Sequence, residues 1–506
     1  MPFKAIILKR DFAMKTRIHR HILFVFLCLC AQLLHAQRTL EYKVGKDARP
    51  NRIRCVGAEL DAHFHANHVP RSEGSKVEDW ANVIVPRIKD MQVQSLRVMV
   101  LPQWYEPRND NDDPAVADNG GFCFDAPQMQ SLYPILDLAQ EMGIPVTIVP
   151  WGATPESFMS SRKGWIVLPE NHEEYAENIS ALLCHLIKDR KYDCIDEVTP
   201  GNEPDGWGMP SSEYVSLCKT LHARLEKDRL LKHVRLNLVD NTDRGGSFDY
   251  LEECVSGLKD IADVVNSHTY IFGYDTPSEK IMQWEEQNCR IAARAGLRHC
   301  VGEFGSNQTM GASRQKDIDQ YRRGVLMVRT AISLLAAGAY NISYWQLFDQ
   351  YYSRHDNYAQ MQQLGMWKSV KADYATEAYY DSICCDYEAR PQFYAYSLLT
   401  RFVRPGARVY RMTADGEMGL TNALCVRNRD KSWVYVVANQ ENTDLCVTLR
   451  NERHPLCGHY EQYVYQEGLL PSDGSQLKPL NGVREAAGSL SVDIPANTVM
   501  LFRFRR

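Results

Sequence analysis

The sequence has no long apolar run beyond its first forty residues, no run of basic charge and no internal repeat. The lack of apolar runs excludes a polytopic membrane protein, because each bilayer crossing needs about 20 such residues. The 58 basic and 63 acidic residues are interspersed and give a net charge of −5, which argues against a nucleic-acid-binding protein. The remaining picture, with 44% hydrophobic and 24% charged residues, is that of a large globular chain.

The sequence also lacks the usual ligand patterns of a zinc site. No Cys-x-x-Cys pair occurs among the 15 cysteines, and the cysteines do not cluster with histidines at metal-ligand spacing. We therefore expect neither a metal nor an organic cofactor. Disulfides are permitted in an exported chain, and Cys425 with Cys446 is the first candidate pair, although the sequence fixes no connectivity.

Residues 1–36 have the features of a secretory signal peptide. Basic residues precede the short apolar run 22–34, and the small residue Ala36 follows it. The run is short for a membrane anchor. Met14 opens this unit and is a second candidate start. We therefore expect export of the bacterial type, to the periplasm, the cell surface or the medium, with no membrane-spanning segment left after cleavage.

Residues 37–403 alternate short β-rich runs with amphipathic stretches of helical period. Eight such runs predict the α/β class and a (β/α)₈ barrel. A doubly wound open sheet is the alternative, but no Gly-rich phosphate loop follows the first run. The runs are Cys55–His63, Ser95–Pro102, Ile144–Trp151, Ile195–Glu203, Val234–Asn241, Val264–Tyr270, His299–Ser306 and Ile342–Asp349.

The pattern changes after a last amphipathic stretch at 391–403, which Pro405 and Gly406 end. Residues 404–506 contain seven short strand-like runs between turn residues and no helical period, which predicts a smaller all-β sandwich domain. Residues 37–54 precede the first barrel strand, and we expect that they can add an edge strand to this sandwich.

Two glutamates stand out at the predicted strand ends, where barrel enzymes carry their chemistry. Glu203 closes the fourth run in Pro-Gly-Asn-Glu-Pro, and Glu303 lies near the end of the seventh in Gly-Glu-Phe-Gly. The fourth and seventh strands face each other across an eight-stranded ring, so both side chains can meet in one cleft. Two carboxylates about 5 Å apart are what a retaining glycosidase needs. In the alternative reading, each caps a helix or pairs with an arginine such as Arg97.

These motifs resemble those of the clan A retaining (β/α)₈ glycoside hydrolases. The resemblance covers residues 52–403, and the chain end Leu490–Phe502 is similar to the sandwich appended to several families of that clan. The resemblance implies that Glu203 is the general acid/base and Glu303 the nucleophile. It also implies that Asn202 binds the sugar 2-hydroxyl.

Further roles follow from the resemblance for residues of other strands. It implies that Arg97 keeps the nucleophile ionised and that Tyr270 hydrogen-bonds it, with His268 alongside. Trp345 matches the tryptophan that floors the sugar site. Alternatively, Arg97 is a buried salt-bridge partner, His268 a structural histidine, and the two aromatics belong to the core.

The third strand departs from the pattern of several families of the clan. It ends at Trp151, where those families carry a histidine, so we name no family. Aromatic residues in strand-end loops, Trp104 and Trp151 among them, are candidates for stacking on sugar rings or are scattered surface aromatics. The segments 104–124 and 350–390 are long enough to wall a cleft.

The sequence therefore predicts a secreted retaining glycoside hydrolase that cleaves β-glycosidic bonds of a poly- or oligosaccharide, with an endo-acting enzyme as one option. The first alternative is an exo-β-glycosidase acting on oligosaccharides. The second, from another class, is a non-catalytic carbohydrate-binding barrel, which the presence of both carboxylates disfavours. The expected partner is a carbohydrate, and the oligomeric state stays open.

Overall fold

The computed structural model describes most of the chain downstream of residue 37. The described residues are 38–60, 80–118, 120–161, 168–242, 248–271, 273–306, 317–351, 361–362, 364–368 and 388–505. The predicted signal peptide, the alternative start at Met14, residues 61–63 at the end of the first predicted run, and most of the predicted wall 350–390 lie outside them.

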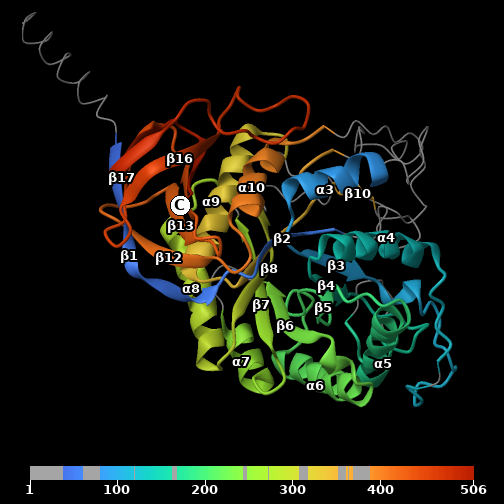
Figure 1. Ribbon diagram of the computed structural model, residues 1–506. Coiled ribbons are helices and arrows are strands. Elements are labelled where there is room, and N and C mark those ends of the chain that lie inside the picture. The colour runs from blue at the N-terminus through green and yellow to red at the C-terminus, as the bar shows by residue number, and fades with distance from the viewer. Residues whose placement is uncertain are drawn as a thin grey trace, which may run out of the picture.

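The first domain is a closed barrel of eight parallel strands (Figure 1). The strands follow one another around the ring in sequence order, and the last pairs with the first. Each predicted run overlaps one of them, with β6, β7 and β9 extending one residue beyond their runs, so the (β/α)₈ prediction is confirmed. The strands are β2 Cys55–Glu59, β3 Leu96–Val100, β4 Val146–Pro150, β5 Ile195–Val198, β6 Arg235–Thr242, β7 Val264–Ile271, β8 His299–Ser306 and β9 Asn341–Tyr344.

Helices surround this ring and cover the apolar outer faces of its strands (Figure 1). Helix α9 is buried along almost its whole length because it also supports the second domain through β13 and β14. The long helices are α3 Val85–Met91, α4 Pro127–Met142, α5 His172–Leu183, α6 Ser211–Lys227, α7 Asp249–Leu258, α8 Ser278–Arg294, α9 Tyr321–Ala337 and α10 Pro391–Phe402. Short helical turns are η2 Trp80–Ile84, η3 Pro102–Trp104, η4 Cys184–Asp189 and η5 Leu230–Lys232.

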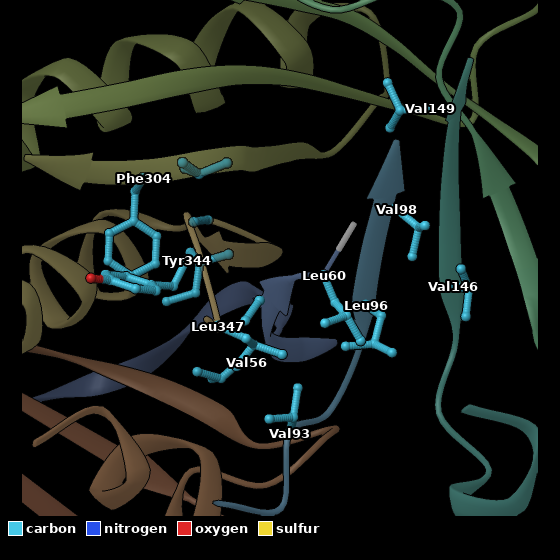
Figure 2. Packing of buried hydrophobic residues seen from close by; sticks show 14 of the residues in the cluster. Val56, Leu60, Val93, Leu96, Val98, Val146, Val149, Phe304, Tyr344 and Leu347 are labelled. Carbon is cyan, nitrogen blue, oxygen red and sulfur yellow. The ribbon is translucent and has the colours of Figure 1, made fainter. Parts of the chain in front are cut away.

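The packing between strands and helices follows the two-residue period of a strand. In β3, Leu96 and Val98 are buried, and Leu96 is the register partner of Val146 of β4 (Figure 2). Phe304 of β8 meets the ring of Tyr344 edge-on, with centroids 5.5 Å apart. The residues between these apolar positions point into the barrel, and this alternation brings polar side chains to the interior.

The second domain is an eight-stranded all-β sheet that closes on itself. Its first strand comes from the other end of the chain: β1, drawn in blue, lies among the orange and red strands of Figure 1. It pairs antiparallel with β12 and parallel with β15, so the two ends of the chain build this domain together. The strands are β1 Arg38–Arg52, β12 Arg408–Ala414, β13 Thr421–Arg427, β14 Trp433–Asn439, β15 Leu445–Arg450, β16 Leu456–Tyr465, β17 Glu485–Ile494 and β18 Thr498–Phe504.

The proposed disulfide between Cys425 and Cys446 is wrong. Both are free thiols, as are all the other cysteines of the described residues. Cys425 lies on β13 and Cys446 on β15, and these strands are not neighbours in the ring. Burial accordingly raises the pKa of the Cys425 thiol well above its ordinary value.

Within the described ranges, no helix is both long and apolar enough to cross a membrane. A two-stranded hairpin, β10 Gln350–Tyr351 and β11 Met361–Gln362, completes the described elements.

Candidate active site

The carboxyl ends of the barrel strands bring the sequence-predicted polar residues into one buried network. Arg97 lies in the middle of β3, between two apolar residues that point outward, so its own side chain points inward. It is 4% exposed. His268 and Tyr270 come from β7 in the same alternation, and Glu303 comes from β8. Asn202 and Glu203 lie in the turn that follows β5.

Arg97 is the centre of this network and donates to four groups. Its Nη1 donates to Glu59 Oε2 at 2.5 Å and to Glu303 Oε1 at 2.6 Å. Its Nη2 donates to the side-chain oxygens of Asn202 and Asp240, each at 2.8 Å. Burial works to lower the pKa of Arg97, but the three carboxylates outweigh it and raise this pKa well above its ordinary value. The guanidinium therefore stays cationic and fixes several acceptors at once.

Glu303 is almost fully buried and held on both oxygens. Tyr270 donates its hydroxyl to Oε2 at 2.6 Å, while Arg97 occupies Oε1. The glycines beside it allow this close packing. A Cβ at Gly302 would lie 2.6 Å from Asn266 Oδ1, and one at Gly305 would lie 2.9 Å from the Tyr270 ring. The two glycines of the Gly-Glu-Phe-Gly motif are therefore needed because a larger residue at either position would clash with neighbouring side chains.

Glu203 is the more accessible of the two glutamates, with its side chain 28% exposed against 5% for Glu303. An oxygen of Glu203 and an oxygen of Glu303 lie within 4.8 Å of each other, and His268 is within the same distance of both. Glu203 has a φ of +50°, and its N–H donates to the Asp240 carbonyl at 3.0 Å. A left-handed backbone at a non-glycine residue is a strained feature that often accompanies function.

His268 connects the two glutamates to Asp240. Its Nδ1 lies 2.8 Å from Glu203 Oε1, and its Nε2 lies 3.1 Å from Asp240 Oδ1. Burial works to lower the pKa of His268, but Glu303, Asp240 and the hydrogen bonds to its ring raise it well above its ordinary value. The pKa of Asp240 is lowered despite burial, because Arg97 and His268 both face it. Both ring nitrogens thus face a carboxylate oxygen at hydrogen-bond distance, so the ring is a poor metal ligand here.

The tryptophans differ widely in exposure. Trp104 in η3 is 3% exposed and Trp151 after β4 is 8% exposed, and both belong to the apolar core. Trp345, which follows β9 and precedes a cis peptide bond, is half-buried. Trp207 is 46% exposed, and its N–H donates to the Glu203 carbonyl at 3.2 Å. Trp207 is therefore the most exposed of these aromatics, and it lies four residues after Glu203 in the chain.

Two members of the network were not among the residues selected from the sequence. Glu59 ends β2 and Asp240 lies in β6, and both side chains are fully buried. Asp240 has a sequence signal, because it stands at a predicted strand end. The sequence signal of Glu59 is weaker, because it is only a single acidic residue in an apolar run. Its hydrogen bond with Arg97 is what assigns it to the site.

No family model matches the chain, and no curated protein is similar to it in sequence. Solved structures do match. Over 92% of its length, the chain superposes on all of the catalytic domain of GH30 xylanase C from Talaromyces cellulolyticus, at 15% identity and a TM-score of 0.60. A conserved exported protein from Bacteroides fragilis matches over 92% and 100% of the two chains, at 12% identity and a TM-score of 0.65. An endo-β-1,6-glucanase matches over 92% and 94%, at 13% identity and a TM-score of 0.60.

The chain has the fold of the clan A glycoside hydrolases. The resemblance inferred from its motifs is therefore confirmed at the level of fold, and it extends through the second domain, since the matches span both. At these identities the likeness assigns no family and no substrate. The clan A fold does place the fourth and seventh strand ends, where Glu203 and Glu303 stand, at one face of the barrel.

Proposed function

We propose that this chain is an exported retaining glycoside hydrolase that cleaves β-glycosidic bonds of a poly- or oligosaccharide. The observation that carries the proposal is the approach of Glu203 and Glu303 to within 4.8 Å. Retaining enzymes hold their two carboxyl groups about 5–5.5 Å apart, whereas inverting enzymes need about 6.5–9.5 Å to admit a water. The glycosidase names of the structural neighbours support the same reaction class.

In the first step, Glu303 attacks the anomeric carbon while Glu203 protonates the departing glycosidic oxygen. Arg97 and Tyr270 donate to the two oxygens of Glu303, which fixes the orientation of the nucleophile. His268 Nδ1 lies 2.8 Å from Glu203 Oε1, so we assign the transferable proton to the other oxygen of Glu203. The C–O bond to the leaving group breaks as the glycosyl-enzyme bond forms.

In the second step, the same groups exchange roles. Glu203, now ionised, accepts a proton from a water molecule that attacks the anomeric carbon, and Glu303 leaves with its bonding electrons. The exposure of Glu203 supports this role, since water and leaving group must both reach it. Asn202 uses its Oδ1 to accept from Arg97, which leaves its amide nitrogen to donate to the sugar 2-hydroxyl.

The exposed aromatic residue Trp207 bears on the substrate class. As the acid, Glu203 would stand on the leaving-group side of the scissile bond, and we propose that the exposed Trp207, four residues further along the chain, stacks on a sugar there. A sugar platform on that side favours an endo-acting enzyme. An exo-β-glycosidase is the second candidate, and product analysis on β-glucans, xylans, mannans and galactans separates the two.

The decisive experiment replaces the nucleophile. Glu303→Ala should reduce turnover to background, and external azide should restore part of it by forming the α-configured glycosyl azide. Glu252→Ala, which removes an exposed glutamate of α7, is the matched control and should keep full activity. Unchanged activity of Glu303→Ala would remove this residue as nucleophile, and a chain without any hydrolase activity that still binds glycans would instead be the carbohydrate-binding barrel.

The acid/base assignment has its own test. Glu203→Ala should lose about 10²–10⁴-fold on substrates with poor leaving groups. Substrates whose leaving group needs no protonation should lose far less in the first step. Equal losses on both substrate types would contradict the role of Glu203 as acid.

A further inference from the structure

A second group of buried carboxylates lies away from the catalytic network. Glu106 follows η3 in the segment after β3, and Glu174 and Glu177 lie in the first turns of α5. One carboxylate oxygen from each lies within 4.8 Å of the other two, and each residue is 1% exposed. Three carboxylates at this distance, removed from water, repel each other strongly unless protons or a cation neutralise them.

Individual oxygens of Glu106 and Glu174 have no hydrogen-bond partner among the described residues. Glu106 Oε1 and Glu174 Oε1 are buried and receive none, and both carboxylate oxygens of neighbouring Asp110 are buried in the same way. Two neutral amides donate to the group: Asn178 donates to Glu106 Oε2 at 2.7 Å, and Asn109 donates to Glu174 Oε2 at 2.9 Å. Among the described residues, no lysine or arginine forms an ion pair with Glu106, Asp110 or Glu174.

The charges within the group act on one another. Burial raises the pKa of Glu106 to about 8, and neighbouring Glu177, Asp110 and Glu174 add to the effect while the Asn178 hydrogen bond opposes it. Burial likewise raises the pKa of Glu174 to about 7, with Asp110 contributing. Asp110 is thus close enough to act on both glutamates, and all of its effect is repulsive.

We propose that Glu106, Asp110, Glu174 and Glu177 form a binding site for one Ca²⁺ ion. Ca²⁺ takes six to eight oxygen ligands in flexible geometry, and carboxylates are its preferred protein donors. The unpartnered oxygens of Glu106, Glu174 and Asp110 would supply this kind of ligand. Mg²⁺ fits less well, because it requires near-ideal octahedral geometry and gives up its water reluctantly.

The site joins two parts of the molecule that border the active face. Residues 105–123 connect β3, the strand of Arg97, to α4, whereas Glu174 and Glu177 belong to α5 after β4. A bound ion therefore fastens the loop after β3 to the next helix around the ring. Its effect falls on stability and on the loop, because no carboxylate of this group contacts Glu203 or Glu303 in the described network.

The experiment uses the purified mature chain, stripped of divalent ions with EDTA and then freed of chelator. Calorimetric titration with CaCl₂ should give one ion per chain, and Ca²⁺ in hundredfold excess over Kd should raise the Tm by about 2 °C or more. MgCl₂ at the same concentration should give a smaller shift. Terbium bound at the site should show luminescence sensitised by Tyr105, which Ca²⁺ abolishes by competition.

The variants separate a metal site from a general salt effect. The double variant Glu106→Gln with Glu174→Gln should lose the Ca²⁺ response, and without Ca²⁺ it should be at least as stable as the parent, because two repelling charges are gone. Glu173→Gln, an exposed neighbour on the same helical turn, is the matched control and should keep the full response. If the double variant fails to fold, the terbium competition on the parent chain decides.

Several outcomes would overturn the proposal. An unchanged Tm and no heat of binding with Ca²⁺, together with stability that varies only with pH, would mean that the carboxyls share protons instead. Equal shifts with Mg²⁺ would reject Ca²⁺ as the ion, and a full response in the double variant would place the ion elsewhere. These measurements do not use catalytic activity, so they stand or fall separately from the proposed hydrolase function.

Discussion

Arg97 shows at the scale of one residue how the active face is built. A single guanidinium binds groups from four strands or strand ends: Glu59, Asn202, Asp240 and Glu303. Buried ions of this kind are costly to leave unpaired, and removing one partner typically costs about 3–5 kcal/mol. The residue therefore links folding stability to the position of the proposed nucleophile.

We predict that Arg97→Lys destabilises the protein by about 3 kcal/mol and lowers kcat strongly. Lysine keeps the charge but lacks the planar fork that reaches four acceptors. Arg54→Lys is the control, because Arg54 also pairs with two carboxylates but at the opposite end of the strands. Urea unfolding and kcat, measured where both variants are folded, should show stability losses in both and a kcat loss in Arg97→Lys alone. A normal kcat in Arg97→Lys would refute the positioning role.

His268 gives the network a pH dependence. Its pKa is raised in the folded state, so a folded chain retains a proton that the unfolded chain releases above pH 6.5. The stability that His268 contributes is thus complete below pH 6.5 and is lost as the pH rises toward the folded pKa, by at most about 1.4 kcal/mol per pH unit. Urea midpoints of the parent and His268→Gln, compared from pH 6 upward, should converge with increasing pH; a constant difference would contradict this prediction.

Trp207 is the aromatic residue whose exposure suits substrate contact. We predict that Trp207→Ala raises KM for a polymeric substrate several-fold and leaves cleavage of a glycosyl fluoride unchanged, because only the polymer carries a sugar on the leaving-group side. The control is Leu469→Ala, which removes an exposed apolar side chain of the second domain and leaves the active face intact. Trp433→Ala is unsuitable because the ring of Trp433 is buried. Equal effects on the two substrates would argue against a platform at Trp207.

At the scale of elements, irregularities in strand pairing aim the side chains of the site. The pairing of β6 with β7 shifts between Val239 and Asn241, around Asp240. The pairing of β7 with β8 shifts between Ser267 and His268, and that of β8 with β9 shifts next to Glu303. Bulges of this kind redirect side chains and are common beside active sites. The flanking glycines supply the space that the redirected side chains need.

We therefore predict that Gly302→Ala costs about 1–3 kcal/mol of stability and most of the activity. The new methyl group would lie 2.6 Å from Asn266 Oδ1 and 2.9 Å from Asp240 Oδ1, so the buried network has to move. Gly416→Ala is the control, because its Cβ meets only a leucine methyl at 3.4 Å. Thermal unfolding and kcat test both variants, and an unaffected Gly302→Ala would show that the network tolerates displacement.

At the scale of the whole molecule, the two domains are built as one unit. β1 belongs to the second sheet, yet β2 follows it directly in the barrel. Tyr321 at the start of α9 stacks on Tyr465 of β16, with ring centroids 4.6 Å apart, and their hydroxyls bond to backbone carbonyls across the contact. Helix α9 is consequently covered on one side by the barrel and on the other by the sheet.

Deletion of residues 404–506 should therefore not release a functional barrel. The deletion removes both strands that pair with β1, and it exposes the apolar side of α9 to solvent. Large exposed apolar surfaces promote association between chains. We expect the truncated chain to aggregate, as judged by size-exclusion chromatography of the soluble fraction. A monomeric truncated chain with parental activity would contradict this view of the two domains.

The residues that sequence reasoning could identify are those whose local pattern carries the information. Eight apolar β-rich runs determined the barrel, and a glutamate at each of two strand ends, Glu203 and Glu303, followed from their motifs. The pairing of Cys425 with Cys446 was wrong because cysteine positions say nothing about strand order. The exposure of Trp104 and Trp151 was equally invisible, since a loop position does not reveal what packs over it.

The chain by itself thus determined which segments form strands and where the reactive carboxylates stand, because side-chain period and turn residues are local properties. Only the closure of the barrel brings Glu59, Asp240 and Glu303 within hydrogen-bond distance of Arg97. The tertiary structure likewise brings the buried carboxylates of Glu106 and Glu174 close together. Residues separated by a hundred or more positions become neighbours through strand register and bulges. The electrostatic energy that tunes them depends on distances of a few ångströms, which only tertiary packing sets.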